Sequence, residues 1–313
     1  MMHIRHFSLL AVALAASCAG GPAPKFDPDL EQQILQKRAQ QEQLRERQED
    51  FDKALIDIDK AIDSYASAKL HSEYQRSAQQ ADKIYTFLKS ASTKHFNRLV
   101  RAADDASNNA YRAKAAGALG FSEKPEALDP LLNAINSDDA TVATNAAFAL
   151  GVLKDPRTPP AVLASRIENP ELSPEERAGS ANSMFQLQGA LHDAAPAYAV
   201  WLRLLSEPPQ ELDPILAVIA LRGLSRSRDA AHSEVATKFI AHPRPMVREM
   251  AAICLGYLGD RDTHEVLLTR LQPQETNPNV RLAARKALQA LAGNIDRGYD
   301  VDQWRKVFQT RNG

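Results

Sequence analysis

The stretch VREMAAICLGYLGD, residues 247–260, decides how this chain folds because it places small side chains in the middle of an expected helix. Ala251, Ala252 and Gly256 stand where larger apolar residues would bury more surface. Alone, the stretch predicts only a helix with a weak end. It gains a structural meaning if the pattern returns elsewhere in the chain, since recurrence at a regular period is typical of repeat architectures.

The pattern returns at intervals of 31, 34, 40, 31 and 33 residues. One apolar residue, before each Leu-Gly type corner, serves as the anchor of its repeat: Leu119, Leu150, Met184, Leu224, Leu255 and Leu288. Four positions before the anchors stand only small residues: Ala115, Ala146, Ser180, Ala220, Ala251 and Ala284. Residues at these spacings share one helical face. We therefore expect closely stacked helices, with Gly120, Gly151 and Gly256 marking the corners where helices end.

A second apolar segment lies between successive anchors, as in EALDPLLNAI at 126–135 and THEVLLTRL at 263–271. Polar breaks such as NSDDA at 136–140 follow these segments. Helix, turn, helix and break, repeated along the chain, predict an all-α fold. The expected architecture is an α-solenoid of about six helix pairs over residues 93–293, preceded by a helical hairpin.

These repeats resemble the HEAT-repeat family, in the short form also seen in phycobilisome lyases. The resemblance is weaker in the middle, where Phe185 and Ser225 replace the glycine and prolines crowd the connections. It implies that the second helix of each pair lines a concave side and that a recurring arginine pairs with an acid in an adjacent turn. Four arginines stand seven positions before an anchor: Arg112, Arg177, Arg248 and Arg281. Their period favours hydrogen bonding between repeats over contact with a ligand.

Two heptad-like apolar stripes precede the repeats, one from Leu44 to Tyr65 and one from Tyr74 to Leu88. They predict an antiparallel helical hairpin within residues 30–92. We expect this hairpin to cap the first repeat, because terminal repeats need atypical covers. Dimerisation or partner docking is the alternative, and the oligomeric state stays open.

Aromatic residues gather after the last repeat, in residues 294–313. Trp304 and Phe308 stand four positions apart, on one face of a short expected helix. We expect a capping helix that covers the open apolar end of the array. An exposed pair that binds a partner is the alternative.

The first 17 residues are typical of an export signal. Arg5 precedes the apolar run FSLLAVALAA, which is much shorter than the ~20 residues of a membrane-spanning helix. AASC, at 15–18, resembles the bacterial lipoprotein signal, although Ala15 stands where leucine is commonest. The resemblance implies that Cys18 is lipidated and begins a flexible tether over 18–29.

A lipidated Cys18 implies an outer-membrane lipoprotein that faces the periplasm, since Ala19 rather than aspartate follows the cysteine. Cleavage after residues 13–15 is the alternative and would give a soluble periplasmic protein with a free thiol. The other cysteine, Cys254, is expected to be an inert core thiol.

Sequence motifs of catalysis are absent: no GxSxG, P-loop, HExxH, dinucleotide fingerprint or zinc spacing occurs. We therefore expect no catalytic, cofactor-binding or metal-binding residue, and no enzyme. The net charge of −1 provides no broad field for binding nucleic acid. Enzymatic chemistry like that of the phycobilisome lyases is the alternative that the resemblance adds.

The expected function is a lipid-anchored cell-envelope scaffold that binds a partner protein through the solenoid surface. A structural subunit of an envelope machine is the second interpretation. Departures from a repeat are places where function overrides packing, so residues 170–230 are the expected binding segment. Trp201 lies within it as a candidate partner-binding residue, with a core position as the equal alternative.

Overall fold

The computed structural model describes residues 28–70 and 75–309, and every regular element within these two ranges is a helix. Contacts divide the chain after Asp52, and the two parts are described separately. The expected signal peptide, Cys18 and most of the tether lie outside the described residues.

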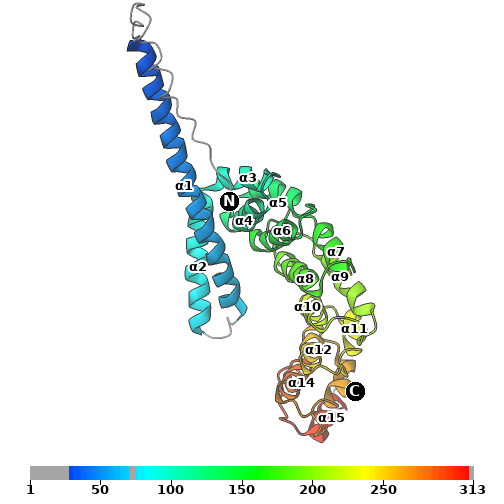
Figure 1. Cartoon of the computed structure of the whole chain (residues 1–313). Coiled ribbons are helices and arrows are strands. Elements are labelled where there is room, and N and C mark those ends of the chain that lie inside the picture. Colours follow the sequence, from blue (N-terminus) through cyan, green and yellow to red (C-terminus); the bar gives the residue numbers. More distant parts are fainter. Residues whose placement is uncertain (1–27, 71–74, 310–313) are drawn as a thin grey trace, which may run out of the picture. The chain divides into compact units, whose positions relative to one another are not determined.

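Twelve α-helices form six successive pairs and confirm the predicted α-solenoid (Figure 1). The first helices of the pairs are α3 (Phe96–Asp104), α5 (Leu128–Ala134), α7 (Pro160–Glu168), α9 (Ala195–Ser206), α11 (Ser233–Thr237) and α13 (His264–Leu268). The second helices are α4 (Asn109–Leu119), α6 (Ala140–Leu153), α8 (Pro174–Gln188), α10 (Pro214–Leu224), α12 (Pro245–Leu258) and α14 (Pro278–Leu291). Short 3-10 turns extend the connections: η1 (Gly120–Ser122), η2 (Pro125–Ala127), η3 (Ser225–Ser227), η4 (Ala230–His232) and η5 (Arg261–Thr263).

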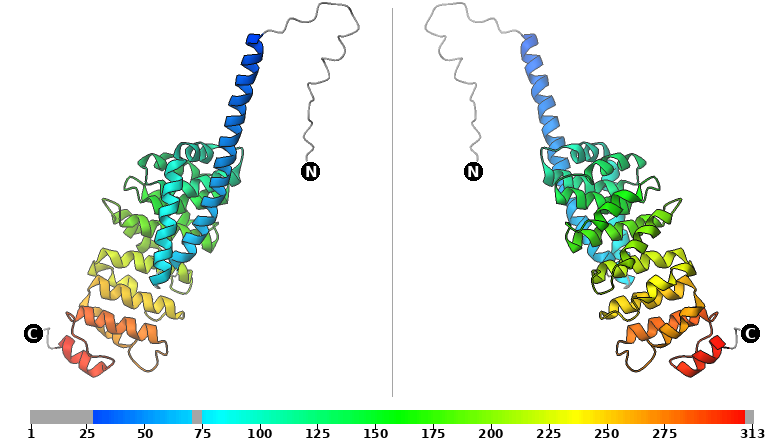
Figure 2. Two further views of the ribbon diagram at one scale, coloured as in Figure 1. Left: turned by 90° about the vertical axis from the view of Figure 1, so that its left-hand side faces the viewer. Right: turned by 90° about the vertical axis from the view of Figure 1, so that its right-hand side faces the viewer.

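The second helices stack on one another in a single layer, and the first helices form the other layer (Figures 1 and 2). Each second helix contacts the next one along the chain. The small residues four positions before the anchors are all buried at these contacts: Ala115, Ala146, Ser180, Ala220, Ala251 and Ala284. The predicted role of small side chains in close stacking is therefore confirmed.

The prediction that the glycines after the anchors end their helices holds for Gly120, which is the C-cap of α4, and is wrong for Gly151 and Gly256. Gly151 and Gly256 lie inside α6 and α12, which continue for two more residues. The left-handed residues that end these helices come later, at Lys154 (φ 53°) and Gly259 (φ 80°).

All three glycines are points of close approach between neighbouring second helices. A Cβ atom built on each would come within 3 Å of the next helix: Gly120 at 2.7 Å from Cα of Ala149, Gly151 at 2.7 Å from Cα of Ser183, and Gly256 at 2.9 Å from Cα of Ala287. A missing side chain, rather than an unusual backbone conformation, is what these positions require.

The middle of the array departs from this arrangement, as the sequence indicated. Phe185 takes the place of the contact glycine, and the guanidinium groups of Arg222 and Arg226 lie 4.4 and 3.6 Å from its ring centre. Helix α8 begins with a capping box, in which the side chains of Ser173 and Glu176 each accept a hydrogen bond from the other residue's backbone N–H. Asp213 caps α10 in a similar way by accepting bonds from two backbone N–H groups.

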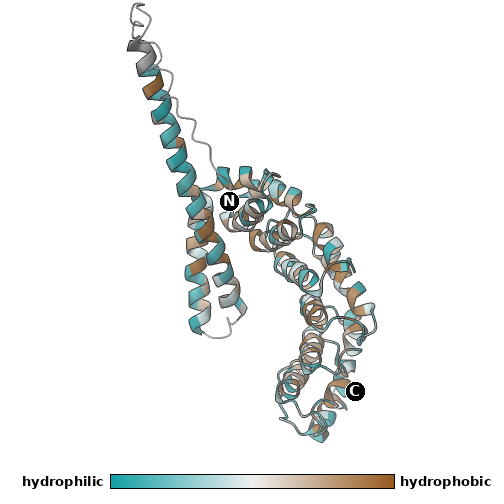
Figure 3. Cartoon of the chain, viewed as in Figure 1, coloured by the Kyte–Doolittle hydropathy of each residue, from teal (hydrophilic) through white to brown (hydrophobic). Residues whose placement is uncertain are grey.

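Helices α1 (Pro28–Leu70) and α2 (Gln75–Lys94) form the predicted hairpin, and α2 contacts α4 and η1. Ile58 and Leu88 are fully buried. The part of α1 before residue 52 is mostly hydrophilic, as Figure 3 shows, and Leu44 there is 64% exposed. The structure thus places the hairpin where a cap on the first repeat would lie.

Helix α15 (Val301–Gln309) follows the last pair and buries the aromatic residues of the C-terminal segment. The Nε1 of Trp304 donates to the carbonyl of Gly298 at 3.0 Å. The ring of Phe308 stacks on His264 of α13 with 4.5 Å between centres. Trp304 and Phe308 therefore cover apolar surface of the last pair.

Candidate functional site

Three of the four periodic arginines form hydrogen bonds near the ends of the first helices. Three donate to a main-chain carbonyl at or just beyond the end of the first helix of their own pair: Arg112 to Ala103 at 2.9 Å, Arg177 to Ile167 at 2.8 Å, and Arg248 to His242 at 2.8 Å. The guanidinium of Arg281 lies 4.8 Å from the ring centre of Tyr299. These contacts support the structural interpretation of the arginine series.

Arg248 also forms the ion pair that the family resemblance implied. Its Nε and Nη2 bind the two carboxylate oxygens of Glu275, in the next repeat, at 2.7 and 2.8 Å. Glu275 is buried, and the Arg248 guanidinium holds the pKa of this carboxyl below its usual range. Arg270 lies 3.6 Å away on the same carboxylate. The cluster fixes the fifth pair against the sixth.

Trp201 is a core residue, which corrects its candidate role in partner binding. Its side chain is 0% exposed, and Nε1 donates to Oε1 of Gln188 at 2.9 Å. Gln188 in turn donates to the carbonyl of Gly223 at 3.1 Å, and the indole fills the space that a side chain at Gly223 would need. A buried, hydrogen-bonded indole has no free face for a partner.

Clusters of metal ligands and reactive thiols are absent from the described part of the chain. No group of three or more His, Cys, Asp or Glu side chains suited to a metal ion occurs within residues 28–70 and 75–309. Cys254 is fully buried, and this burial raises the pKa of its thiol to about 12. No helix within the same ranges has the length and apolar character needed to span a membrane.

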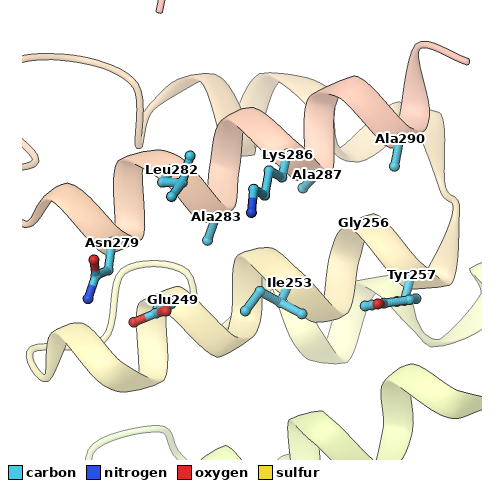
Figure 4. Close-up of a pocket in the computed structure, with 10 residues that line it drawn as sticks. All are labelled: Glu249, Ile253, Gly256, Tyr257, Asn279, Leu282, Ala283, Lys286, Ala287 and Ala290. Atoms are coloured by element: carbon cyan, nitrogen blue, oxygen red, sulfur yellow. The ribbon is translucent and has the colours of Figure 1, made fainter. Parts of the chain in front are cut away.

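A groove of about 440 Å³ opens between α12 and α14 (Figure 4). Ten residues line it: Glu249, Ile253, Gly256, Tyr257, Asn279, Leu282, Ala283, Lys286, Ala287 and Ala290. The close approach at Gly256 forms its floor, because small residues there bring the two helices together. The groove is mostly apolar, as binding sites commonly are.

Exposed apolar side chains gather around this groove. Tyr257 is 57% exposed and Leu282 39%, and both line the groove itself. Met246 on α12 and Ile215 on α10 are also exposed, at the same repeat position nine residues before their anchors. Exposed apolar side chains that line a groove, as Tyr257 and Leu282 do, are typical of an interaction site.

Two charged side chains of the groove lack an opposite charge. Glu249 is partly buried and forms no ion pair or hydrogen bond within the described residues. Burial raises the pKa of its carboxyl. Lys286, on the facing helix, is exposed and likewise has no partner in the part of the chain that the structure describes. The groove thus combines apolar walls with one acid and one base.

The sequence indicated the middle of the array, residues 170–230, as the binding segment, whereas the groove lies in two of the most regular repeats. Its signal was present in the sequence: Ile253, Tyr257 and Leu282 are apolar on the helix side opposite the small residues. The column of small residues predicts packing on its own side of the helix and leaves the opposite side without a prediction.

The two-layer stack of helix pairs defines an α-solenoid repeat protein. The family model for HEAT repeats matches residues 96–181 and 202–297, which together exceed half of the 313 residues. The chain therefore belongs to the HEAT-repeat family.

Three solved structures are similar to this chain at low sequence identity. Two are engineered proteins from the Northeast Structural Genomics Consortium. One is 19% identical, with a TM-score of 0.47 over 63% of this chain and 96% of the other. The second is 18% identical, with a TM-score of 0.47 over 82% and 72%.

The third is the complex of CpcE and CpcF of phycocyanin lyase from Nostoc sp., 19% identical with a TM-score of 0.38 over 80% and 92%. No curated protein matches the chain.

Proposed function

We propose that this protein is a lipid-anchored cell-envelope scaffold that binds a partner protein through the second-helix layer of its solenoid. The groove between α12 and α14 carries the proposal, because it leaves apolar side chains and an unpaired carboxylate uncovered. Extended surfaces for protein binding are the common use of α-solenoids. The proposal assigns no catalytic residue and no cofactor.

The anchor is proposed from the sequence, because residues 1–27 lie outside the described part. AASC at 15–18 and the Gly/Pro-rich segment after it support acylation of Cys18, at the outer membrane and facing the periplasm. A single acyl chain gives marginal membrane binding, so stable anchoring requires more than one. Mass spectrometry of the mature N-terminus tests this: an acylated Cys18 supports the anchor, and an unmodified start at Ala16 contradicts it.

The scaffold itself is tested by chemical crosslinking in the native envelope, followed by pull-down of the full mature chain. A partner recovered with wild type and with Cys18→Ala released from membranes would show that binding belongs to the solenoid. Recovery in fixed stoichiometry with several envelope proteins would favour the second interpretation, a structural subunit of a larger machine. Recovery of no protein in either case would contradict both.

A further inference from the structure

The first repeat shows how a helix lies on a second helix of this array. Helix α1 runs along α4 and the turn η1 with three successive contacts: Asp59 with Lys114 of α4 at 2.9 Å, Ile62 with Gly117 of α4 at 3.4 Å from a Cβ built there, and Tyr65 with Phe121 of η1 at 5.3 Å between ring centres. Both series ascend in residue number, so the two helices run parallel at this contact. The spacing of three residues keeps all the contacts on one side of α1.

The groove repeats the surface that α4 offers to α1. Lys114, Gly117 and Phe121 stand five before, two before and two after the anchor Leu119. The equivalent residues are Met250, Ile253 and Tyr257 on α12, and Ala283, Lys286 and Ala290 on α14. All of these except Met250 line the groove. The last two repeats therefore present, uncovered, the positions through which the first repeat receives a helix.

Charge defines one end of this surface. On α4 the base Lys114 is neutralised by Asp59 of the arriving helix. In the groove the acid Glu249 lies opposite Asn279 at one end, and it is partly buried without a partner in the described residues (Figure 4). Burial of an unpaired carboxylate is unfavourable, and an arriving cation would relieve it.

We propose that the groove receives one amphipathic helix of a partner protein, with apolar side chains three or four residues apart against Ile253, Leu282 and Tyr257, and a Lys or Arg directed to Glu249. This inference rests on the proposed scaffold function. It matches the helix-in-groove mode of recognition, in which anchors recur at helical spacing.

The described residues of this chain offer no equally suitable helix. The segment of α1 that carries the matching apolar stripe, from Asp59 to Tyr65, already lies on α4. Residues 31–50 of α1 are rich in Gln, Glu and Arg, and their larger apolar residues, Ile34, Leu35 and Leu44, are too widely spaced to form one stripe. A partner protein is therefore the occupant that the chemistry favours over a second copy.

The test places a photo-crosslinking phenylalanine analogue at Tyr257 in the full-length chain, in its native cells. Control positions are Asn182 on the second-helix layer at α8 and Glu234 on α11. We expect capture at Tyr257 of a protein whose joined peptide has apolar residues at helical spacing and a basic residue beside them. Glu249→Lys should reduce this capture by about tenfold, because it sets like charges together.

Reversal of the partner's basic residue to glutamate should restore capture by the Glu249→Lys chain. The matched variant Glu234→Lys, an equal charge change on the other layer, should leave capture unchanged. Glu249→Gln keeps the shape and loses the charge, so it should reduce capture less than Glu249→Lys does. Circular dichroism verifies that each variant keeps the helical fold of the wild type.

Three results would overturn the inference. The first is a joined peptide that comes from this chain or lacks a helical apolar pattern, and the second is capture that Glu249→Lys leaves unchanged. The third is capture at Asn182 but not at Tyr257, which leaves the scaffold function standing. Absence of capture at every second-helix position would contradict the scaffold function as well.

Discussion

The first and the fifth repeat differ in whether their equivalent aromatic residues are covered by other parts of the chain. Phe121 and Tyr257 occupy the same repeat position, two residues after their anchors. Phe121 is 0% exposed beneath the rings of Tyr65 and Tyr85, whereas Tyr257 is 57% exposed. Phe121 is therefore part of the core, whereas the ring of Tyr257 is mostly exposed to solvent.

This difference separates apolar surface that the fold buries from apolar surface that it leaves exposed. Apolar surface left in water forgoes stabilisation of roughly 25 cal/mol per Å². The chain covers such surface at both ends of the array, with the hairpin and with α15, yet leaves the groove open. Stability alone does not explain a bare apolar face, which is the observation that the proposed partner protein would account for.

The largest expected effect comes from removing the two equivalent aromatic side chains. Phe121→Ala should lower the free energy of unfolding by about 3–5 kcal/mol, because it leaves a cavity beneath the hairpin. Tyr257→Ala should change it by about 0.5 kcal/mol or less, since its ring is mostly in water. Urea unfolding followed by circular dichroism measures both. Equal losses in the two variants would mean that the two faces are covered alike.

A second prediction concerns the ion pair that holds the groove walls. Glu275→Gln should cost about 1.5–3 kcal/mol at neutral pH, because Arg248 loses a buried charged partner. Arg248 lowers the pKa of Glu275 below its ordinary value of 4.5. The stability from this pair is therefore present above pH 4.5 and lost as the pH falls through the folded-state pKa.

Urea unfolding of wild type and Glu275→Gln between about pH 7 and pH 3 checks this. The difference between the two proteins should shrink below pH 4.5. A difference that stays constant across the range would show that the pair contributes packing and not charge.

Replacing a contact glycine by alanine should destabilise the protein equally at the covered and at the bare end of the array. Gly120→Ala and Gly256→Ala should each cost about 1–3 kcal/mol, since the added Cβ meets the neighbouring helix. Gly179→Ala is the matched control on α8, where a Cβ meets nothing within 4 Å. It should stabilise the helix by about 0.5–1 kcal/mol. Thermal melts measure all three, and a neutral Gly256→Ala would mean that α12 and α14 are loosely packed.

Periodic features of the array could be predicted from the sequence. The column of small residues from Ala115 to Ala284 indicated which helix face is buried, because each repeat faces the same neighbour. Gly120 ends α4 as predicted, whereas Gly151 and Gly256 lie inside their helices, since a Leu-Gly pair suits a helix end as well as a close approach. The left-handed ends at Lys154 and Gly259 carry no consistent residue type.

The groove depends on contacts that no local pattern encodes. Whether Tyr257 is exposed depends on how far the hairpin, which lies far earlier in the chain, extends over the second-helix layer. The same limit applies to Trp201, whose burial depends on Gln188 and Gly223 of two other helices. Residue types alone left both of its interpretations open.

The smallest expected effect is a change in the free energy of unfolding at the groove residue Glu249. Its sign should be opposite to that of the same kind of change at the covered end. Glu249→Gln should stabilise the protein without its partner at neutral pH, by about 0.5 kcal/mol or less, because a partly buried unpaired carboxylate disfavours folding. Burial raises the pKa of Glu249 above its ordinary value of 4.5. Relative to the Glu249→Gln variant, the wild type should thus be equally stable below pH 4.5 and become less stable as the pH rises through the folded-state pKa.

Paired urea unfolding curves at about pH 4 and pH 7 measure this sign. The equivalent change at the covered end, Asp59→Asn, removes a charge that is paired with Lys114, so it should destabilise slightly instead. Opposite signs at the two ends would mean that the groove keeps a carboxylate which folding disfavours and which a partner's cation would satisfy. A loss of stability in Glu249→Gln at neutral pH would show that Glu249 serves the fold, and the comparison between the covered and the bare face would fail at that residue.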